Sequence, residues 1–213
     1  GAGMLGSWVT HALARMVEEV DVWDGSDRVE EGNIGNQAYN ELDVGDWKAA
    51  ALQLSLVGLN VRSKHAIFPD LHGRLEPGDH LPNIVVACAD TMAARRAGAV
   101  WSQDKGVPLF IDTRASGLDA TIITVLPGEY DRYLAELPSD EELDGVPCGA
   151  TGTAFVGMFV AARVACLVDV WVDHTHEAIP IRESWYVYRA IPYEIIWRGG
   201  DTTTRESELR PGR

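Results

Sequence analysis

The sequence predicts an α/β fold, with a mainly parallel sheet flanked by helices and additional strands toward the C-terminus. Apolar runs of strand length alternate with segments of helical periodicity through the first half of the chain, as in strands joined by crossover helices. The chain opens on GAGMLGSWVTHALARM, in which Gly1, Gly3 and Gly6 fit G-x-G-x-x-G. That turn seats a phosphate against a helix N-terminus. Together these features predict a Rossmann-like domain.

The first third of the chain shows two helices and two strands. Apolar residues recur at three- and four-residue steps from Leu5 to Met16, which predicts a helix. A short strand is predicted over 19–24, a helix over 46–59 with Asp46 as its N-cap, and a strand over 64–68. The helix residues predicted to face inward are Ala49, Leu52, Leu56 and Leu59.

The rest of the chain continues the alternation and then turns to strands. NIVVAC, residues 83–88, is a continuous apolar run of the kind that a buried parallel strand requires. Further strands are predicted over 108–111, 120–126 and within 185–197, and helices over 92–101 and 150–172. The acidic segment 130–145 is predicted to be a solvated loop or short helix.

One domain accounts for the whole chain. We expect residues 1–172 to form a nucleotide-binding domain and residues 173–213 to add strands and a polar tail to it. The glycine motif normally follows a buried strand, so we expect that strand to lie upstream of Gly1.

Composition narrows the class of protein. The formal net charge of −14 argues against a nucleic-acid-binding face, because phosphate contacts need clustered Lys and Arg. Three widely spaced cysteines predict a reducing, cytoplasmic location. The apolar stretch 150–172 contains Arg163 and Asp169, so we interpret it as a core helix and expect no membrane contact.

Three side chains place polar chemistry around the glycine turn. Asp24 follows the glycines by about 20 residues, the spacing of an acid that holds ribose hydroxyls. Lys48, in DVGDWKAAAL, supplies an ammonium of the kind that stabilises charge on an α-phosphate. Asp90 follows an apolar strand, where a carboxylate can hold Mg²⁺ beside phosphates.

The ordered set of motifs carries a family resemblance. GAGMLGS, VWDGSDRVEEGNIGNQ, DVGDWKA and VVACADTMAARR resemble, in that order, the ThiF/MoeB adenylyltransferases, over about residues 1–170. The resemblance implies use of ATP and Mg²⁺ to adenylate a carboxylate, often the C-terminus of a small ubiquitin-like protein, or of a peptide. It also implies a homodimer.

The resemblance assigns roles to individual residues. It implies that Asp90 binds Mg²⁺ and that Lys48 and Asn33 act on the phosphates. The nucleotide-binding positions that it implies are Gly1, Gly3, Gly6, Asp24, Asp27, Asn33, Asn36, Gln37, Lys48, Asp90 and Thr91. Asn36 stands where the family has an arginine, so we expect Arg62 or an arginine of a partner subunit to take its place, or catalysis to be slow or lost.

The cysteines and the overall function leave alternatives open. Cys148 precedes the long apolar helix, where a thiol could receive the activated acyl group or could simply be buried. Cys88 and Cys166 are predicted to be inert core residues. The motifs also fit an NAD(P)-dependent oxidoreductase or a nucleotide-binding scaffold that has lost catalysis, although an oxidoreductase leaves Asn33, Lys48 and Asp90 without a role.

Overall fold

The computed structural model describes residues 1–25, 27–66, 68, 80–117, 119–141, 154–174, 185–189 and 194–198. Their N-terminal elements are α1 (Met4–Leu13), β1 (Val20–Trp23), the 3-10 turns η1 (Glu31–Asn33) and η2 (Glu41–Asp43), α2 (Lys48–Ser55) and β2 (Val61–Lys64). The remaining elements are β3 (Ile84–Ala87), α3 (Met92–Lys105), β4 (Leu109–Ser116), β5 (Asp119–Val125), α4 (Tyr130–Glu136), α5 (Ala154–His174), β6 (Trp185–Arg189) and β7 (Glu194–Arg198). The predicted α/β class is confirmed.

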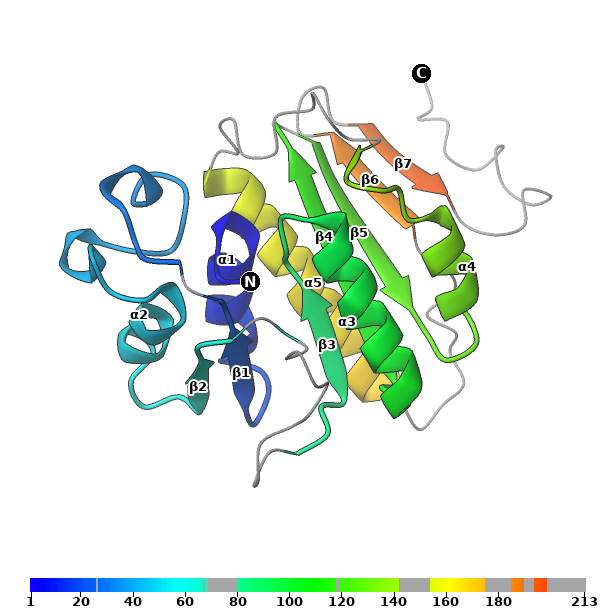
Figure 1. The fold of residues 1–213 in the computed structure, drawn as a ribbon, viewed down its shortest axis with the longest axis horizontal. Coiled ribbons are helices and arrows are strands. Elements are labelled where there is room, and N and C mark those ends of the chain that lie inside the picture. Colours follow the sequence, from blue (N-terminus) through cyan, green and yellow to red (C-terminus); the bar gives the residue numbers. More distant parts are fainter. Residues whose placement is uncertain are drawn as a thin grey trace, which may run out of the picture.

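The strands form two sheets in the described part of the chain (Figure 1). Strands β1 and β2 pair in parallel, and so do β3 and β4, each pair being joined by a connection that contains a helix. From β4 onward the order β4-β5-β6-β7 is antiparallel throughout. The parallel part therefore carries the glycine turn and the acids that follow the strands, and the antiparallel part extends the sheet away from them.

Helices cover both faces of the five-stranded sheet (Figure 1). Alternation along β4 sends Leu109 and Ile111 into a core shared with α1 and α5, and sends Phe110 into a second core shared with α3 and α4. A third cluster joins α2 to β1 and β2. This layering fixes the start of α1 and the start of α3 at the same end of the molecule.

The predicted bounds of the second helix, 46–59, and of the strand after it are wrong, and the helix ends at Ser55. The second helix begins at Lys48 after Trp47, not at Asp46, and Leu59 is exposed rather than inward. The strand after it covers Val61–Lys64, earlier than the predicted 64–68, and Val61 pairs with Val20. Gly58, between the end of the helix and the strand, has a positive φ of 92°, which turns the chain before the strand begins.

Helix α5 is the only helix among the described residues that is long and apolar enough to cross a membrane by length and composition alone. In the fold one side of it packs on α1 and the sheet, through Val156, Val160 and Val164. A Cβ added at Gly157 would lie 2.4 Å from Cδ1 of Trp8, so glycine allows α5 to approach α1 closely. Helix α5 thus serves as a core helix, as the sequence predicts.

The close approach at Gly157 gives a stability test. We expect Gly157→Ala to lower the free energy of unfolding by about 1–3 kcal/mol, because the added methyl group displaces the Trp8 ring. The matched control is Gly98→Ala in α3, whose Cβ would lie 3.7 Å from Phe110, an ordinary contact. That change should stabilise by up to about 1 kcal/mol through helix propensity. Urea unfolding curves measure both, and equal effects would contradict the packing account.

Candidate functional site

The glycine turn at the start of the chain lies against the end of β3. A Cβ at Gly1 would lie 2.7 Å from the Cys88 carbonyl oxygen, and a Cβ at Gly6 would lie 1.8 Å from the Gly1 carbonyl oxygen. Neither position has room for a side chain. A Cβ at Gly3 would meet nothing within 4 Å, so the open side of the turn is at Gly3.

Helices α1 and α3 both begin beside the glycine turn, and they differ in which groups accept hydrogen bonds from their first N–H groups. At α3, Thr91 Oγ1 accepts the Ala94 N–H at 3.2 Å, and the Asp140 carboxylate accepts the N–H groups of Met92 and Ala93 at 2.6 and 3.1 Å. At α1, Gly3 is the N-cap, no side chain among the described residues caps the helix, and its first turn has no acid. Free N–H groups and the helix dipole favour an anion at α1, while Asp140 already provides one at α3.

Asp24 holds the other side of the turn. It directly follows β1, and its Oδ2 accepts the Ala2 N–H at 2.8 Å. Its own N–H donates to the Lys64 carbonyl at 3.1 Å, which ties it to the end of β2. The carboxylate is half-buried beside the glycines, where nucleotide-binding α/β folds place an acid for ribose hydroxyls.

The loop 31–38 is seated on α1. Trp8 Nε1 donates to the Asn36 carbonyl at 3.2 Å, and the Ala38 N–H donates to Ser7 Oγ at 3.0 Å. The side-chain oxygens of Asn36 and Gln37 are buried and have no hydrogen-bond partner within the described residues. Buried polar atoms of this kind normally find a partner. The loop therefore keeps hydrogen-bonding capacity for a ligand beside the glycine turn.

Asn33 has a local role in the same loop. Its Oδ1 accepts the Glu30 N–H at 3.0 Å, in a reciprocal capping box across η1. This bond fixes the turn that carries the loop toward Asn36.

Tyr39 ties the glycine turn to α2. Its hydroxyl lies 2.6 Å from the Ala2 carbonyl oxygen and 3.3 Å from that of Lys48. Burial raises the pKa of the Tyr39 hydroxyl well above its usual value, and the carboxylates of Asp24, Asp43 and Asp27 raise it further. Tyr39 therefore stays a neutral donor, and it connects two segments that hold predicted site residues.

Lys48 opens α2 and is buried. Its Nζ lies 3.2 Å from Oδ2 of Asp27, and its backbone N–H donates to the Asp27 carbonyl at 2.9 Å. The Asp27 side chain is 69% exposed, whereas that of Lys48 is 10% exposed. The ammonium is thus held by one carboxylate that itself faces solvent.

Asp90 lies in the short connection between β3 and α3, and it is exposed. The carbonyl before it, that of Ala89, accepts a hydrogen bond from Arg95 Nη2. Groups of three or more His, Cys, Asp or Glu that could hold a metal ion are absent from the part of the chain that the structure describes. A divalent cation at Asp90 would take its other oxygen ligands from phosphates and water, which is the usual arrangement for Mg²⁺.

Arg62 does not replace the loop arginine. It donates from Nε to Asp21 Oδ1 at 2.7 Å and from Nη2 to Glu19 Oε1 at 2.6 Å. These acids lie at the start of β1, the opposite end of the strand from Asp24. The structure therefore gives Asn36 no substitute from Arg62.

The three cysteines differ in their position and their exposure. Cys148 lies outside the described residues. Cys166 is exposed on α5, so its assignment to the core was wrong; the residue lies on the side of the helix turned away from the sheet. Cys88 lies under the glycine turn, accepts a bond from Thr113 Oγ1 at 3.2 Å, and has its thiol pKa raised by burial. A raised pKa keeps Cys88 in the unreactive thiol form.

Sequence reasoning missed a buried charged cluster behind Asp90. It consists of Arg95, Asp112, Arg114 and Tyr133. The available signal was Asp112, a lone acid that ends the apolar run PLFI in a predicted strand. A charge in that position needs partners from other elements.

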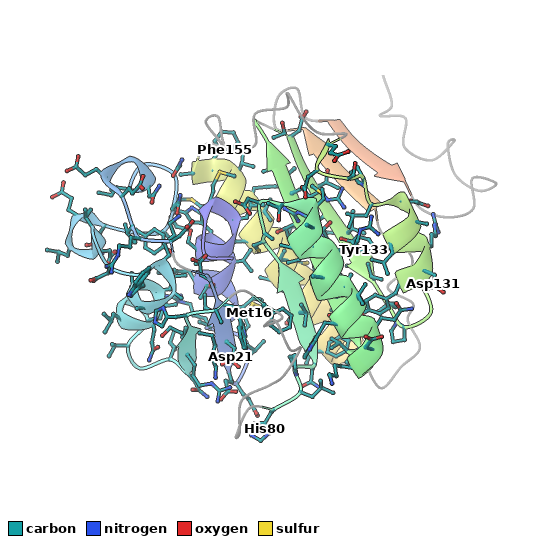
Figure 2. The ribbon with its side chains drawn as sticks, in the orientation of Figure 1. Met16, Asp21, His80, Asp131, Tyr133 and Phe155 are labelled. Atoms are coloured by element: carbon teal, nitrogen blue, oxygen red, sulfur yellow. The ribbon has the colours of Figure 1, made fainter. Side chains whose placement is uncertain are left out.

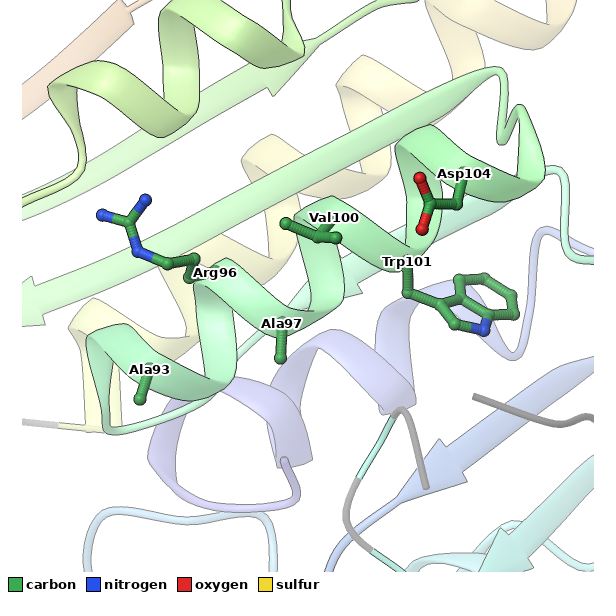
Figure 3. Close-up of a pocket in the computed structure, with 6 residues that line it drawn as sticks. All are labelled: Ala93, Arg96, Ala97, Val100, Trp101 and Asp104. Carbon is green, nitrogen blue, oxygen red and sulfur yellow. The ribbon is translucent and has the colours of Figure 1, made fainter. Parts of the chain in front are cut away.

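A shallow, open depression lies elsewhere, along the outer face of α3 (Figure 3). Its lining residues are Ala93, Arg96, Ala97, Val100, Trp101 and Asp104. None of them is a predicted site residue. The candidate site is therefore the glycine turn and its surroundings, not this depression.

These features define a Rossmann-like α/β domain with a glycine turn before its first helix and acids at the carboxyl ends of its parallel strands. The family model described as "ThiF family" matches residues 1–180. The chain belongs to the ThiF family. No curated protein matches the sequence.

Solved structures share the fold at low sequence identity. Escherichia coli MccB with ATP is 17% identical, with a TM-score of 0.70 over 93% of this chain and 61% of that one. The microcin C7 biosynthetic enzyme MccB in complex with N-formylated MccA is 18% identical, with a TM-score of 0.71 over 93% and 62%. PaaA is 19% identical, with a TM-score of 0.70 over 93% and 62%. The chain thus spans about three fifths of these relatives, and the likeness supports the fold.

Proposed function

We propose that the chain is an ATP-dependent adenylyltransferase that activates the carboxylate of a peptide, or of the C-terminus of a ubiquitin-like protein. In the reaction a carboxylate oxygen attacks the α-phosphorus of ATP, the bond from that phosphorus to the bridging oxygen of pyrophosphate breaks, and an acyl-adenylate forms. The observation that carries the proposal is the convergence of the open turn at Gly3, Asp24 and Asp90 at one end of the parallel strands.

The residues present fit a nucleotide. The α1 N-terminus offers N–H groups to phosphate, Asp24 offers a carboxylate to ribose, and Asn36 and Gln37 have buried oxygens that lack partners among the described residues. Mg²⁺ would be held by Asp90 and would neutralise phosphate charge.

We assign to Lys48 the stabilisation of negative charge in the transition state. In this structure its ammonium is neutralised by Asp27, whose carboxylate faces solvent. A phosphate that enters beside Asp27 competes for the same ammonium. Negative charge grows on the α-phosphate oxygens during attack, so the attraction to Lys48 strengthens as the reaction proceeds.

Two structures of relatives support the choice of acceptor. Structures of MccB were solved with ATP and with N-formylated MccA. A peptide is therefore the first acceptor to test on this chain, with a ubiquitin-like protein second.

A nucleotide-binding scaffold without catalysis is the second candidate. The observation that favours it is Asn36, a neutral side chain where the family has a loop arginine, together with the engagement of Arg62 at the far end of β1. Such a scaffold would bind ATP and show no exchange of pyrophosphate into ATP.

Nucleotide choice gives the first test. We expect ATP with Mg²⁺ to raise the thermal midpoint and NAD⁺ to leave it unchanged, because only a ligand that binds the folded state stabilises it. At 100 times its Kd, ATP should add about 2.7 kcal/mol to the free energy of unfolding. Differential scanning fluorimetry measures both. Stabilisation by NAD⁺ and not by ATP would mean an oxidoreductase.

Lys48→Ala gives the second test. We expect acceptor-dependent ATP–pyrophosphate exchange to fall about 10²–10³-fold, with a much smaller change in the Kd for ATP, because the ammonium acts mainly on transition-state charge. The control is Lys105→Ala at the far end of α3, which should change neither quantity. Wild-type exchange in Lys48→Ala would remove Lys48 from the catalytic machinery.

We also propose a homodimer through α5. Its side away from the sheet exposes Phe155, Met158 and Val170 at 46%, 48% and 37%, and Figure 2 shows Phe155 at the start of the helix. We expect light scattering at micromolar concentration to give twice the chain mass, and Phe155→Glu with Met158→Glu to give the single mass. A monomeric wild type would contradict the proposal.

Cys148 is proposed to receive the activated acyl group: its thiolate would attack the carbonyl carbon of the acyl-adenylate, AMP would leave, and a thioester would form. Adenylation itself needs no thiol, because the carboxylate oxygen is the nucleophile. We therefore expect Cys148→Ser to keep ATP–pyrophosphate exchange and to abolish a covalent adduct with the acceptor that added thiols cleave. The control is Cys166→Ser on the exposed side of α5, which should keep both. An adduct that persists in Cys148→Ser, seen by mass spectrometry, would rule the role out.

A further inference from the structure

A buried charged cluster lies directly behind the connection that carries Asp90. Arg95 of α3 is 4% exposed, and Asp112 of β4 is completely buried. Tyr133 of α4 is buried as well and lies between α4 and α3 (Figure 2). Arg114, two residues after Asp112 and therefore on the same face of β4, is mostly buried.

The contacts make Arg95 a bridge between β4 and the connection. Its Nη1 donates to Asp112 Oδ1 and, at 2.7 Å, to the Thr113 carbonyl oxygen. Its Nη2 donates to the Ala89 carbonyl oxygen, one residue before Asp90. One planar guanidinium thus joins a fixed carboxylate to the backbone that presents Asp90.

Asp112 is itself held from two further directions. Its Oδ2 accepts the Tyr133 hydroxyl at 2.9 Å and Arg114 Nε at 2.7 Å. The Asp112 carboxylate consequently has little freedom to rotate, and neither does the guanidinium bound to it. The orientation of Arg95 is set by three elements of the fold.

Stability alone does not account for this cluster. Desolvating ions is costly, and well-packed apolar side chains of the same volume often stabilise as well or better. The neighbouring Arg96 links two elements with a smaller desolvation cost. It stays exposed and donates to the carbonyls of Leu134 and Leu137 at 2.9 Å each. What distinguishes Arg95 is the carbonyl that it holds.

The connection is held on its other side too. Thr91 caps α3 through the Ala94 N–H, and Asp140 binds the N–H groups of Met92 and Ala93. Asp90 therefore lies between two anchored backbone segments, although its own side chain is exposed. This is the arrangement of a carboxylate that is fixed in place and open to a ligand.

We propose that Arg95, oriented by Asp112, is a positioning residue for Asp90, and that it sets the affinity of Asp90 for the divalent cation of a metal–nucleotide complex. The proposal rests on the proposed function, in which Asp90 holds Mg²⁺. Arg95 touches no reacting atom; it acts by fixing the Ala89 carbonyl.

The first experiment compares Arg95→Lys with Arg96→Lys. We expect the Mg²⁺ concentration for half-maximal ATP binding, measured by calorimetry, to rise about tenfold in Arg95→Lys and to stay unchanged in Arg96→Lys. Lysine keeps the charge but cannot span Asp112 and Ala89 with one planar fork. Should Arg95→Lys not fold, Arg95→Gln serves, because Asp112 keeps Arg114 as its partner. An unchanged Mg²⁺ requirement would overturn the proposal.

A double-mutant cycle tests the route of the effect. If Arg95 acts through Asp90, Arg95→Lys should cause no further loss of Mg²⁺-dependent binding in an Asp90→Asn background. Losses that add would overturn the proposal.

Hydrogen exchange separates this inference from the function on which it rests. Without any ligand, we expect the amides of Asp90 and Thr91 to exchange faster in Arg95→Lys than in the wild type or Arg96→Lys. Equal rates would overturn the positioning role. Failure of the wild type to bind ATP would count against the proposed function alone.

Discussion

The contact between the glycine turn and the end of β3 is the constraint on which the site depends. Gly6 passes so close to Gly1, and Gly1 so close to the Cys88 carbonyl, that neither can carry a side chain. Asp24 holds the same turn from the other side, because its carboxylate accepts a hydrogen bond from the Ala2 N–H. The turn is therefore wedged between the ends of β1 and β3, and the acids after those strands are placed relative to each other by backbone contacts.

Ion pairs are the second feature of the region around the glycine turn and the connection between β3 and α3. Lys48 is paired with Asp27, and Arg95 and Arg114 share Asp112. In a chain with a net charge of −14, each of these buried or partly buried cations lies beside a carboxylate. The two carboxylates differ in their access to solvent: that of Asp27 is exposed, whereas that of Asp112 is completely buried. The Lys48–Asp27 pair is therefore open to water, and the two pairs made by Asp112 are part of the core.

The sequence predicts the parts of this site that are local and misses those that are tertiary. Glycine spacing, the acid after an apolar strand and helical periodicity identify the turn, Asp24, Asp90 and the helices, because each depends on neighbours in the chain. The bond from Arg95 to the Asp112 carboxylate, and the one that Asp140 accepts from the start of α3, join segments that no periodicity connects. The predicted end of the second helix and the predicted start of the next strand are wrong at Gly58, which turns the chain earlier than propensity indicates.

Trp8 contacts both α5, at Gly157, and the loop 31–38. The same indole that fills the notch opposite Gly157 also donates its N–H to the Asn36 carbonyl. Helix α5 and the loop 31–38 share no backbone bond in the described residues, yet both rest on one rigid ring. The helix with the exposed apolar side and the loop beside the glycine turn are therefore connected through a single side chain, that of Trp8.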